Sequence, residues 1–465
     1  MPAILHLFSL PTLTLLVGCA AEVQTSSDSV LVFSDVNVIP MGTERVLEAN
    51  TVVVRDGVIT ALGASDSVEI PQNARIVDGR GCYLMPGLTD FHIHLRSTDE
   101  LLSYLAYGVT TVVHVSGAMS GAPNLLGYRE QLEGGEMLGP RLFTTGPILD
   151  GDPPIFGSVS TVVTTPEEGR RVVEDQKQAG YDFIKVYNNL QPEVFSAVAD
   201  EAREQGMAVL GHIPRIAGRV QALQRALEAG LDLIAHGEEY FFTYFYGDVE
   251  SSLDRGEVPH PDEELIPDAV RMTKDAGAAV IPNLSFVAMT RRMLDSLEVV
   301  LADPETNYLH PDVLEMWREQ NPTRRRDLER FDMREEGKYA FLKRLTKALH
   351  DVGIPLILGS DASAPGLFPG KSAHLELSEL VDAGLSPYEA LATGTRVPAE
   401  FIGKHVASSG QFGTVAVGQH ADLILLTENP LNDIQNITKI SGVMVRGRWL
   451  PSAELQHLRI NRTGD

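Results

Sequence analysis

The sequence predicts an α/β fold, in which a (β/α)8, TIM-like barrel is joined to a small discontinuous β-sandwich. Eight apolar, strand-like runs occur between residues 84 and 360, and helix-like segments separate most of them. Short β-branched runs also occur near both ends of the chain. Neither end has enough strands for a sandwich alone, and chain termini often lie close together. We therefore expect both ends to form one domain.

Length and charge limit the classes of function. The chain has 465 residues, enough for a large core and more than one folded unit, and 43% of them are hydrophobic. There are 63 acidic and 38 basic residues, which give a net charge of −25. This balance argues against nucleic acid or anionic membrane as partners, because both require clustered Lys and Arg. A homo-oligomer is left open.

The first 29 residues differ in composition from the rest. Residues 4–17 are nearly all apolar but too short to span a bilayer, as in the hydrophobic region of a secretion signal. The stretch Leu16-Val17-Gly18-Cys19 resembles a bacterial lipoprotein signal, which implies lipidation of Cys19 and a lipid-anchored protein of the cell envelope, periplasmic or in the outer membrane. A frayed apolar N-terminus is the alternative. Cys82 would then be the one remaining cysteine, and we expect it in the core.

Residues 30–84 form the first part of the predicted sandwich. Residues 51–62 predict a hairpin, because Asp56-Gly57 separates two β-branched runs. Similar strand-like runs recur at residues 421–426 and 442–448. Residues 407–455 are therefore the second part of the predicted sandwich. The barrel is expected between them, over residues 85–406.

The barrel region alternates between strand-like and helix-like segments. Helix-like segments cover residues 166–179, 192–205 and 217–229. Residues 289–347 form a long polar stretch before the last strand, which we interpret as an enlarged helical excursion with a solvated face; a lid over the substrate is the alternative. The eight expected strands are residues 84–95, 109–115, 141–148, 183–187, 208–213, 231–236, 278–284 and 354–360.

Metal-ligating side chains gather at the ends of these strands. His92 and His94 are two residues apart, so in a strand they project from the same face. Neutral imidazole is a common ligand of zinc-like metals. Active-site residues of such barrels come from the C-terminal ends of the strands. The same rim is expected to carry Lys185, His212, His236 and Asp361.

These residues, with the stretch Gly87-Leu88-Thr89-Asp90-Phe91-His92-Ile93-His94, resemble the amidohydrolase superfamily of metal-dependent hydrolases. Within it, the chain looks like the imidazolonepropionase-like group and its Xaa-Pro dipeptidase-like relatives. The sequences of residues 108–112 and 418–424 resemble stretches typical of that group. The resemblance covers nearly all of residues 30–450 and implies a barrel with a two-part β domain.

The resemblance implies a binuclear site. His92, His94 and Asp361 would hold the more buried of two divalent metals, expected to be zinc, and His212 and His236 the more exposed one. Lys185 would react with carbon dioxide to form a carbamate that bridges both metals. An ammonium buried beside two dications would be costly, which favours the carbamate. A lysine that faces outward is the alternative.

The implied chemistry is hydrolysis of a carbon–nitrogen bond. Two metals lower the pKa of a shared water, and one polarises the scissile carbonyl. Asp361 is the expected catalytic residue, which moves a proton to the leaving amine. The resemblance favours a dipeptide or an N-acyl amino acid as substrate.

Residues that bind the substrate are harder to assign. Tyr187, Arg215 and Tyr240 are candidates near the rim for the substrate carboxylate, although each could equally be a packing or surface residue. His374 is a candidate for orienting a ligand, because metal ligands need oriented partners; a polar helix residue is the alternative. His114 ends the second strand and has no assigned role.

Two other functions remain open. A mononuclear relative, a deaminase or an imidazolonepropionase-type hydrolase of a cyclic amide, would use His92, His94, one further histidine and Asp361. Lys185 disfavours this reading, because one metal needs no bridge. A tethered binding protein without catalytic activity is the second alternative, and the intact ligand set argues against it.

Overall fold

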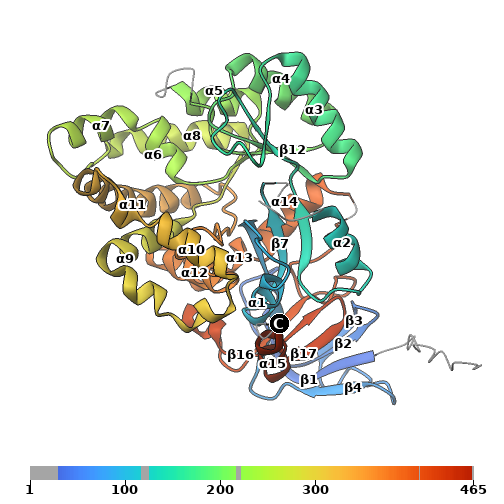
Figure 1. The fold of residues 1–465 in the computed structure, drawn as a ribbon. Helices are drawn as coiled ribbons and strands as arrows, with labels where there is room; N and C mark the ends of the chain where they lie inside the picture. The colour runs from blue at the N-terminus through green and yellow to red at the C-terminus, as the bar shows by residue number, and fades with distance from the viewer. Residues whose placement is uncertain (1–29, 117–124, 216–220, 408, 463–465) are drawn as a thin grey trace, which may run out of the picture.

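The computed structural model describes residues 30–116, 125–215, 221–407 and 409–462. The expected signal segment, residues 4–17 with Cys19, lies outside the described residues. Within the described ranges, no helix is long and apolar enough to cross a membrane. Figure 1 shows the strands of the two chain ends gathered at one end of the molecule, with the helices and strands of the middle of the chain above them.

Eight strands from both chain ends belong to one sheet. Its order is β17-β16-β15-β5-β1-β2-β3, and β4 pairs with β1 beside this path. The hairpin between β2 and β3 turns at Asp56 and Gly57, with φ of 50° and 75°, as a type I′ turn requires. The strands are β1 Val30–Val38, β2 Leu47–Arg55, β3 Val58–Ala64, β4 Arg75–Asp78, β5 Tyr83–Pro86, β15 Leu423–Leu426, β16 Ile440–Val445 and β17 Arg448–Pro451.

Hydrogen bonds connect these eight strands of the expected sandwich into a single sheet. The strand β5 joins the halves: it pairs in parallel with β1 and antiparallel with β15. The sheet encloses a core by bending, so that the ring of Phe33 in β1 meets that of Trp449 in β17 edge-on, with ring centres 5.2 Å apart. Cys82, expected in the core, is only partly buried against this cluster.

In the described part of the middle of the chain, nine further strands form two parallel sheets. One has the order β6-β7-β8 and the other β10-β9-β11-β12-β13-β14. Helices lie between most of these strands in the sequence, so the predicted α/β class is confirmed. The strands are β6 Leu88–Ile93, β7 Val109–His114, β8 Arg141–Thr144, β9 Ile148–Asp150, β10 Ser160–Val162, β11 Phe183–Val186, β12 Ala208–Gly211, β13 Leu233–Ile234 and β14 Ala279–Val280.

Single backbone pairings connect these two sheets and the expected eighth strand. Residues 354–360 contain no regular strand, but they lie extended between β14 and β6. The amide of Phe91 in β6 donates to the carbonyl of Leu358 at 2.9 Å. Parallel bridges join Thr145 to Phe183, Val280 to Leu356 and Ile93 to Ala362.

The expected strand at residues 84–95 is two strands, β5 and β6, in two different sheets. The chain changes sheet at Gly87, whose amide donates to the carbonyl of Asp422 at 2.8 Å. A Cβ on Gly87 would lie 2.1 Å from Thr110 Oγ1, so only glycine fits at this crossing. An apolar run without a break hides such a change of sheet, because both strands are buried.

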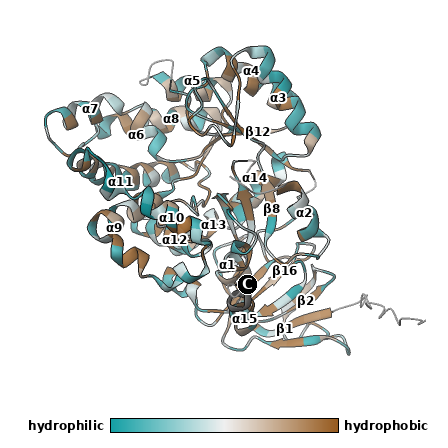
Figure 2. Ribbon diagram, in the orientation of Figure 1, coloured by the Kyte–Doolittle hydropathy of each residue, from teal (hydrophilic) through white to brown (hydrophobic). Residues whose placement is uncertain are grey.

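Among the described residues, eight α-helices precede the expected helical excursion. The helix α3 coincides with the predicted segment and begins with a capping box between Thr165 and Glu168. Figure 2 shows hydrophilic residues along much of α3 and a more hydrophobic β1. The helices are α1 Glu100–Ala106, α2 Leu125–Glu133, α3 Pro166–Ala179, α4 Pro192–Glu204, α5 Ala222–Ala229, α6 Glu238–Thr243, α7 Tyr246–Asp254 and α8 Ile266–Ala276.

The expected excursion is helical and packs close to the strand ends. Trp317, in α10, is fully buried, and its Nε1 donates to the carbonyl oxygen of Ser363 at 3.2 Å. Ser363 lies two residues after Asp361, so the excursion contacts the loop that carries this predicted ligand. The remaining helices are α9 Leu284–Leu301, α10 Pro311–Glu319, α11 Leu328–Asp351, α12 Lys371–Asp382, α13 Pro387–Thr393, α14 Arg396–His405 and α15 Ser452–Arg462.

Candidate metal centre

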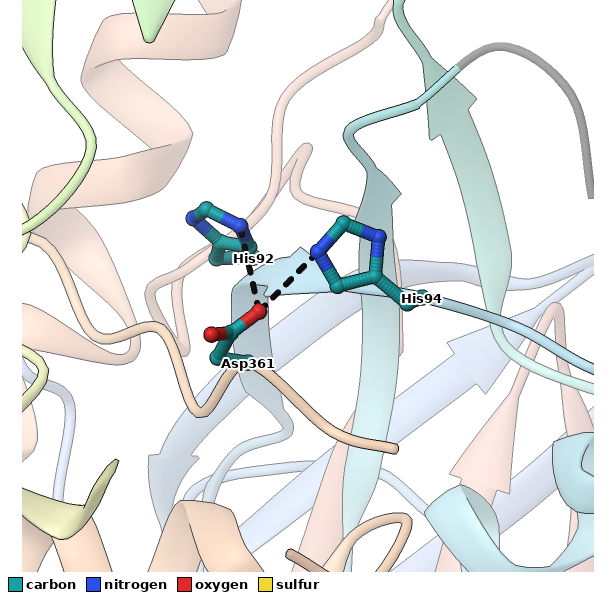
Figure 3. A group of neighbouring side chains, drawn as sticks. All are labelled: His92, His94 and Asp361. Atoms are coloured by element: carbon teal, nitrogen blue, oxygen red, sulfur yellow. Dashed lines mark ion pairs between the residues drawn. The ribbon is translucent and has the colours of Figure 1, made fainter. Parts of the chain in front are cut away.

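Three predicted ligands form a compact group at the end of β6. Figure 3 shows ring nitrogens of His92 and His94 directed towards the carboxylate of Asp361. Asp361 Oδ1 lies 2.9 Å from His94 Nε2 and 3.4 Å from His92 Nε2. The ligand atoms of all three lie within 4.8 Å of one another. Two imidazoles and one carboxylate at this spacing are a suitable donor set for a divalent cation.

Backbone hydrogen bonds hold Asp361 beside the two histidines. The amide of Asp361 donates to the carbonyl of His92 at 2.8 Å, and the amide of His94 donates to that of Ala362. Asp361 has φ of 61°, a left-handed conformation that few residues other than glycine and asparagine adopt readily. The strand end and the loop therefore position the carboxylate before any metal binds.

His92 is the most buried of these ligands. It is fully buried, and within the described residues neither of its ring nitrogens makes a hydrogen bond. Burial lowers the pKa of His92 well below its usual value, and the nearby charge of Lys185 lowers it further. Buried polar atoms are normally satisfied, so a neutral imidazole without partners fits a metal ligand.

Lys185 lies inside β11 and differs from the other buried lysine, Lys338. Lys338 Nζ lies 2.8 Å from Glu238 Oε2 and 2.7 Å from Glu335 Oε2. Lys185 is 2% exposed, yet no carboxylate oxygen of the described chain lies within the 4.0 Å of an ion pair from its Nζ. Burial accordingly lowers the pKa of Lys185 to about 8. At pH 7 about a tenth of its amine is therefore uncharged, far more than for a lysine with its usual pKa.

The other two predicted histidine ligands lie next to this group. The ring centre of His236 is 4.6 Å from that of His92 and 4.8 Å from that of His212. His236 Nδ1 donates to Asn283 Oδ1 at 2.9 Å, so its Nε2 carries the lone pair. All six predicted ligands thus lie at the ends of β6, β11, β12 and β13 and in the loop after residue 360.

A buried carboxylate orients His212. His212 Nδ1 lies 3.0 Å from Glu239 Oε1 and 3.2 Å from Asn188 Oδ1, which leaves Nε2 as the free acceptor. Burial lowers the pKa of His212 to about 4, although Glu239 opposes this shift. The side chain of Arg215 pairs with the same Glu239 oxygen and balances its charge. A carboxylate that holds the second nitrogen of a ligating histidine fixes the ring and raises its basicity.

A second buried carboxylate anchors the helix that begins beside His236. Glu376, in α12, accepts from the amides of Leu284 at 3.1 Å and Ser285 at 2.7 Å, the first residues of α9. The N-terminal amides of a helix lack partners within the helix, and a carboxylate satisfies them. Asn283, which orients His236, is the N-cap of α9. Glu376 therefore helps to hold this histidine in place.

Asp90 joins β6 to the loop that carries Asp361. Its carboxylate is completely buried and accepts from the amide of Ser360 at 2.9 Å, from Ser360 Oγ at 2.5 Å and from the amide of His92 at 3.3 Å. The oxygen of Ser360 in turn accepts from the amide of Ala362 at 3.2 Å. Asp90 thus fixes the residues on either side of Asp361.

We expect Asp90→Ala to destabilise the protein by about 3 kcal/mol, because it leaves three buried donors without an acceptor. Denaturant unfolding of the metal-free protein measures this. Asp78→Ala is the control, since Asp78 pairs with Arg80 on the surface and should change the free energy of unfolding far less. Equal stability of the two variants would show that the bonds of Asp90 add nothing.

Two of the predicted substrate contacts lie at the site. The ring of Tyr187 lies against His212, with ring centres 4.0 Å apart. Arg215 is close to the same histidine, but Glu239 already pairs with its guanidinium. Tyr240, the third candidate, is a packing residue: it is completely buried, and its hydroxyl lies 2.7 Å from Thr273 Oγ1 in α8.

His374 does not orient a ligand, contrary to prediction. Its Nε2 donates to the carbonyl of Tyr107 at 2.7 Å, and it bonds to none of the ligands in the part of the chain that the structure describes. His114 instead connects to a predicted ligand through Ser116. Its Nε2 lies 2.9 Å from Ser116 Oγ, and that oxygen lies 3.4 Å from His94 Nδ1. The partners that the sequence did not predict are Asn188, Glu239, Asn283, Asp90 and Ser116.

Comparison with known proteins identifies a family. Residues 83–450 match the model of the amidohydrolase family. Ochratoxinase from Aspergillus niger is 24% identical over 409 residues, which cover 76% of this chain and 72% of that protein. Enamidase from Eubacterium barkeri is 32% identical over 102 residues, or 20% of this chain. The chain thus matches only 25% of the length of enamidase.

Solved structures resemble the whole fold. A bottromycin amidohydrolase is 25% identical with a TM-score of 0.72, and the match covers 94% of this chain and 91% of the other. A Xaa-Pro dipeptidase with bound methionine in the active site is 19% identical with a TM-score of 0.67, and covers 91% and 100%. At this identity, the second likeness is one of fold alone.

Proposed function

The chain belongs to the amidohydrolase family and is a hydrolase of carbon–nitrogen bonds; on that premise, we propose that it cleaves the amide bond of a dipeptide or an N-acyl amino acid with a binuclear metal site. Members of this family depend on a metal. His92, His94 and Asp361 would hold one divalent cation, and His212 and His236 the other. Lys185, as a carbamate, would bridge the two. Zinc suits this set of imidazole and carboxylate ligands.

The unpaired burial of Lys185 carries this proposal. A buried ammonium without a carboxylate is costly, and the described part of the chain supplies two carboxylates to Lys338 but pairs none with Lys185. A neutral ε-amine adds to carbon dioxide and releases a proton, which converts the side chain into an anion with two oxygens. That anion would offset the charge of two cations between His92 and His212.

In the proposed reaction, the bound metals and Asp361 would have different roles. Bound metals supply a Lewis acid for the scissile carbonyl and lower the pKa of a water towards neutrality. Asp361 accepts the proton that the attacking water loses and donates it to the leaving nitrogen. Burial opposes ionisation of Asp361, but its contact with His94 keeps its pKa below the usual value, so it begins as a base.

We also infer that the parallel strands close into one (β/α)8 barrel. The bridge between Thr145 and Phe183 supports a junction of the two sheets, and the bridges of Leu356 and Ala362 support the eighth position in residues 354–362. A closed barrel would bring the ends of β6, β11, β12 and β13 to the same rim, where the predicted ligands cluster.

Metal analysis combined with a substrate screen tests the proposed function. The protein would be loaded with zinc in the presence of bicarbonate and assayed against dipeptides, including Xaa-Pro members, and N-acyl amino acids. We expect two metals per chain and hydrolysis within this library. One metal per chain would favour a mononuclear enzyme, and a metal-loaded protein that cleaves nothing would contradict the proposal.

We propose further that Cys19 carries a lipid that anchors the enzyme to the cell envelope. The apolar residues 4–17, followed by small residues before Cys19, support this. In a bacterial host, we expect the protein in the membrane fraction and Cys19→Ala in the soluble fraction after cell fractionation. Cys82→Ala is the matched control and should stay with the membranes. Membrane association of Cys19→Ala would contradict the anchor.

A further inference from the structure

The loop that follows β9 exposes two large apolar side chains side by side. Ile155 is 50% exposed and Phe156 is 49% exposed. A single exposed apolar residue is ordinary on a protein surface. Two adjacent exposed apolar residues suggest a binding surface when hydrogen bonds anchor their loop and the loop lies beside the metal centre. Both features are present in this loop.

The carboxylate of Asp150 anchors this loop. Asp150 is completely buried and accepts from the amides of Gly151 at 2.9 Å, Asn189 at 2.8 Å and Ile155 at 2.8 Å. The side-chain amide of Asn189 donates to the carbonyl of Pro153 at 2.8 Å. A Cβ on Gly151 would lie 1.8 Å from the carbonyl oxygen of Asn189, so the two loops pack tightly. The exposed pair is therefore held in place by its own backbone.

Phe156 is connected to the metal centre by one aromatic ring. Its ring meets that of Tyr187 edge-on, with ring centres 5.4 Å apart. Tyr187 lies against His212, with ring centres 4.0 Å apart. A group bound next to His212 would thus have an apolar surface within reach on this side, made of Tyr187 and Phe156 with Ile155 at its edge.

We propose that Ile155 and Phe156 bind a large apolar or aromatic group of the substrate and give the enzyme a preference for such substrates. This rests on the proposed function, since it names the substrate class of the same site. An apolar group that covers these side chains removes surface from water on both partners, which stabilises the complex in proportion to the area buried. The anchored loop needs little ordering on binding, so less of that gain is lost.

The experiment compares matched substrates on the metal-loaded enzyme. The pairs are N-acetyl-phenylalanine with N-acetyl-alanine, and the dipeptides Phe-Ala and Ala-Phe with Ala-Ala. For the wild type, we expect the aromatic member of at least one pair to have the higher kcat/KM. Phe156→Ala should lower kcat/KM about tenfold for that aromatic member and by less than about twofold for its alanine counterpart. Ile155→Ala should shift the same ratio in the same direction.

Control measurements separate this role from a structural one. Phe156 is half exposed, so metal content and thermal unfolding of the variant should match the wild type. Ile76→Ala removes an equally exposed apolar side chain, 55% exposed on β4, and should leave the ratio unchanged. Phe156→Leu keeps an apolar contact and should restore part of the preference.

The outcomes distinguish this inference from the proposed function. If the wild type cleaves both members of every pair equally, or if Phe156→Ala leaves the ratio unchanged, the inference is wrong and the hydrolase stands. If Phe156→Ala changes only the oligomeric state in size-exclusion chromatography, the pair is a contact between copies of the chain and the inference is also wrong. If the wild type cleaves none of these substrates but cleaves other members of the dipeptide and N-acyl amino acid library, the inference is wrong and the hydrolase stands. If it cleaves nothing in the whole library, both fail.

Discussion

Lys185→Ala is expected to lower kcat about 10³-fold and to reduce the metal content from two ions per chain to one or fewer. The reason is the environment of Lys185. It is buried near the charges of Asp361 and Glu239, yet no carboxylate among the described residues pairs with it, and burial lowers its pKa to about 8. Alanine removes the side chain that, as a carbamate, would supply an anion between the two halves of the site. Steady-state kinetics and elemental analysis of the same sample measure both effects.

Rescue experiments show whether the missing group is a carboxylate. Acetate or formate should enter the space left in Lys185→Ala and restore part of both activity and metal content. Lys185→Arg is the matched control: it keeps a positive charge but cannot form a carbamate, so neither anion should rescue it. Full activity of Lys185→Ala without added acetate or formate would contradict the binuclear scheme. If this fully active variant held one metal per chain, the mononuclear alternative would be established.

The residues whose position depends on strand ends could be predicted from the sequence. His92, His94, Lys185, His212, His236 and Asp361 each follow or interrupt an apolar run, and a closed barrel would bring the ends of its parallel strands to one rim. The local sequence pattern is enough to place such residues, because the backbone of each strand determines where the side chains at its end lie.

Contacts between side chains from different loops could not be predicted in this way. Asn188, Glu239 and Asn283 orient the histidines by reaching across from a neighbouring element, and no local periodicity encodes that reach. Their place just after a strand end was the available signal, since Asn188 follows β11 by two residues and Asn283 follows β14 by three. Tyr240 and His374 lie farther from any strand end, inside α6 and α12, and bond to Thr273 and Tyr107.

Apolar pattern also could not show which sheet a strand joins. β5 and β6 are continuous in hydrophobicity across Gly87, although β5 pairs with β15 and β6 with β7. The same ambiguity hid the single bent sheet of the chain ends, because hydrophobicity marks a buried strand but not its neighbour. The turn at Asp56 and Gly57 was predictable, since a type I′ turn demands those residue types locally.

Asp361→Asn should lower kcat by about 10² to 10⁴-fold, since it removes the carboxylate that moves the proton. Asparagine suits the test because it tolerates the left-handed φ of 61° that Asp361 adopts, whereas alanine would strain the loop there. It keeps one oxygen to face His94, from which Asp361 Oδ1 lies 2.9 Å. Kinetics at saturating zinc, with metal content measured in parallel, separate lost catalysis from lost binding.

The pH profile sharpens this prediction further. A base that must be ionised makes kcat/KM fall as the pH drops through its pKa, so the acidic limb due to Asp361 should disappear in Asp361→Asn. Asp422→Asn is the matched control, because Asp422 is also buried and pairs with Arg141 at 2.5 Å in the sheet of the chain ends. It should lower stability but keep the wild-type profile. If fully metal-loaded Asp361→Asn keeps more than about a tenth of the activity, the proton passes through another group.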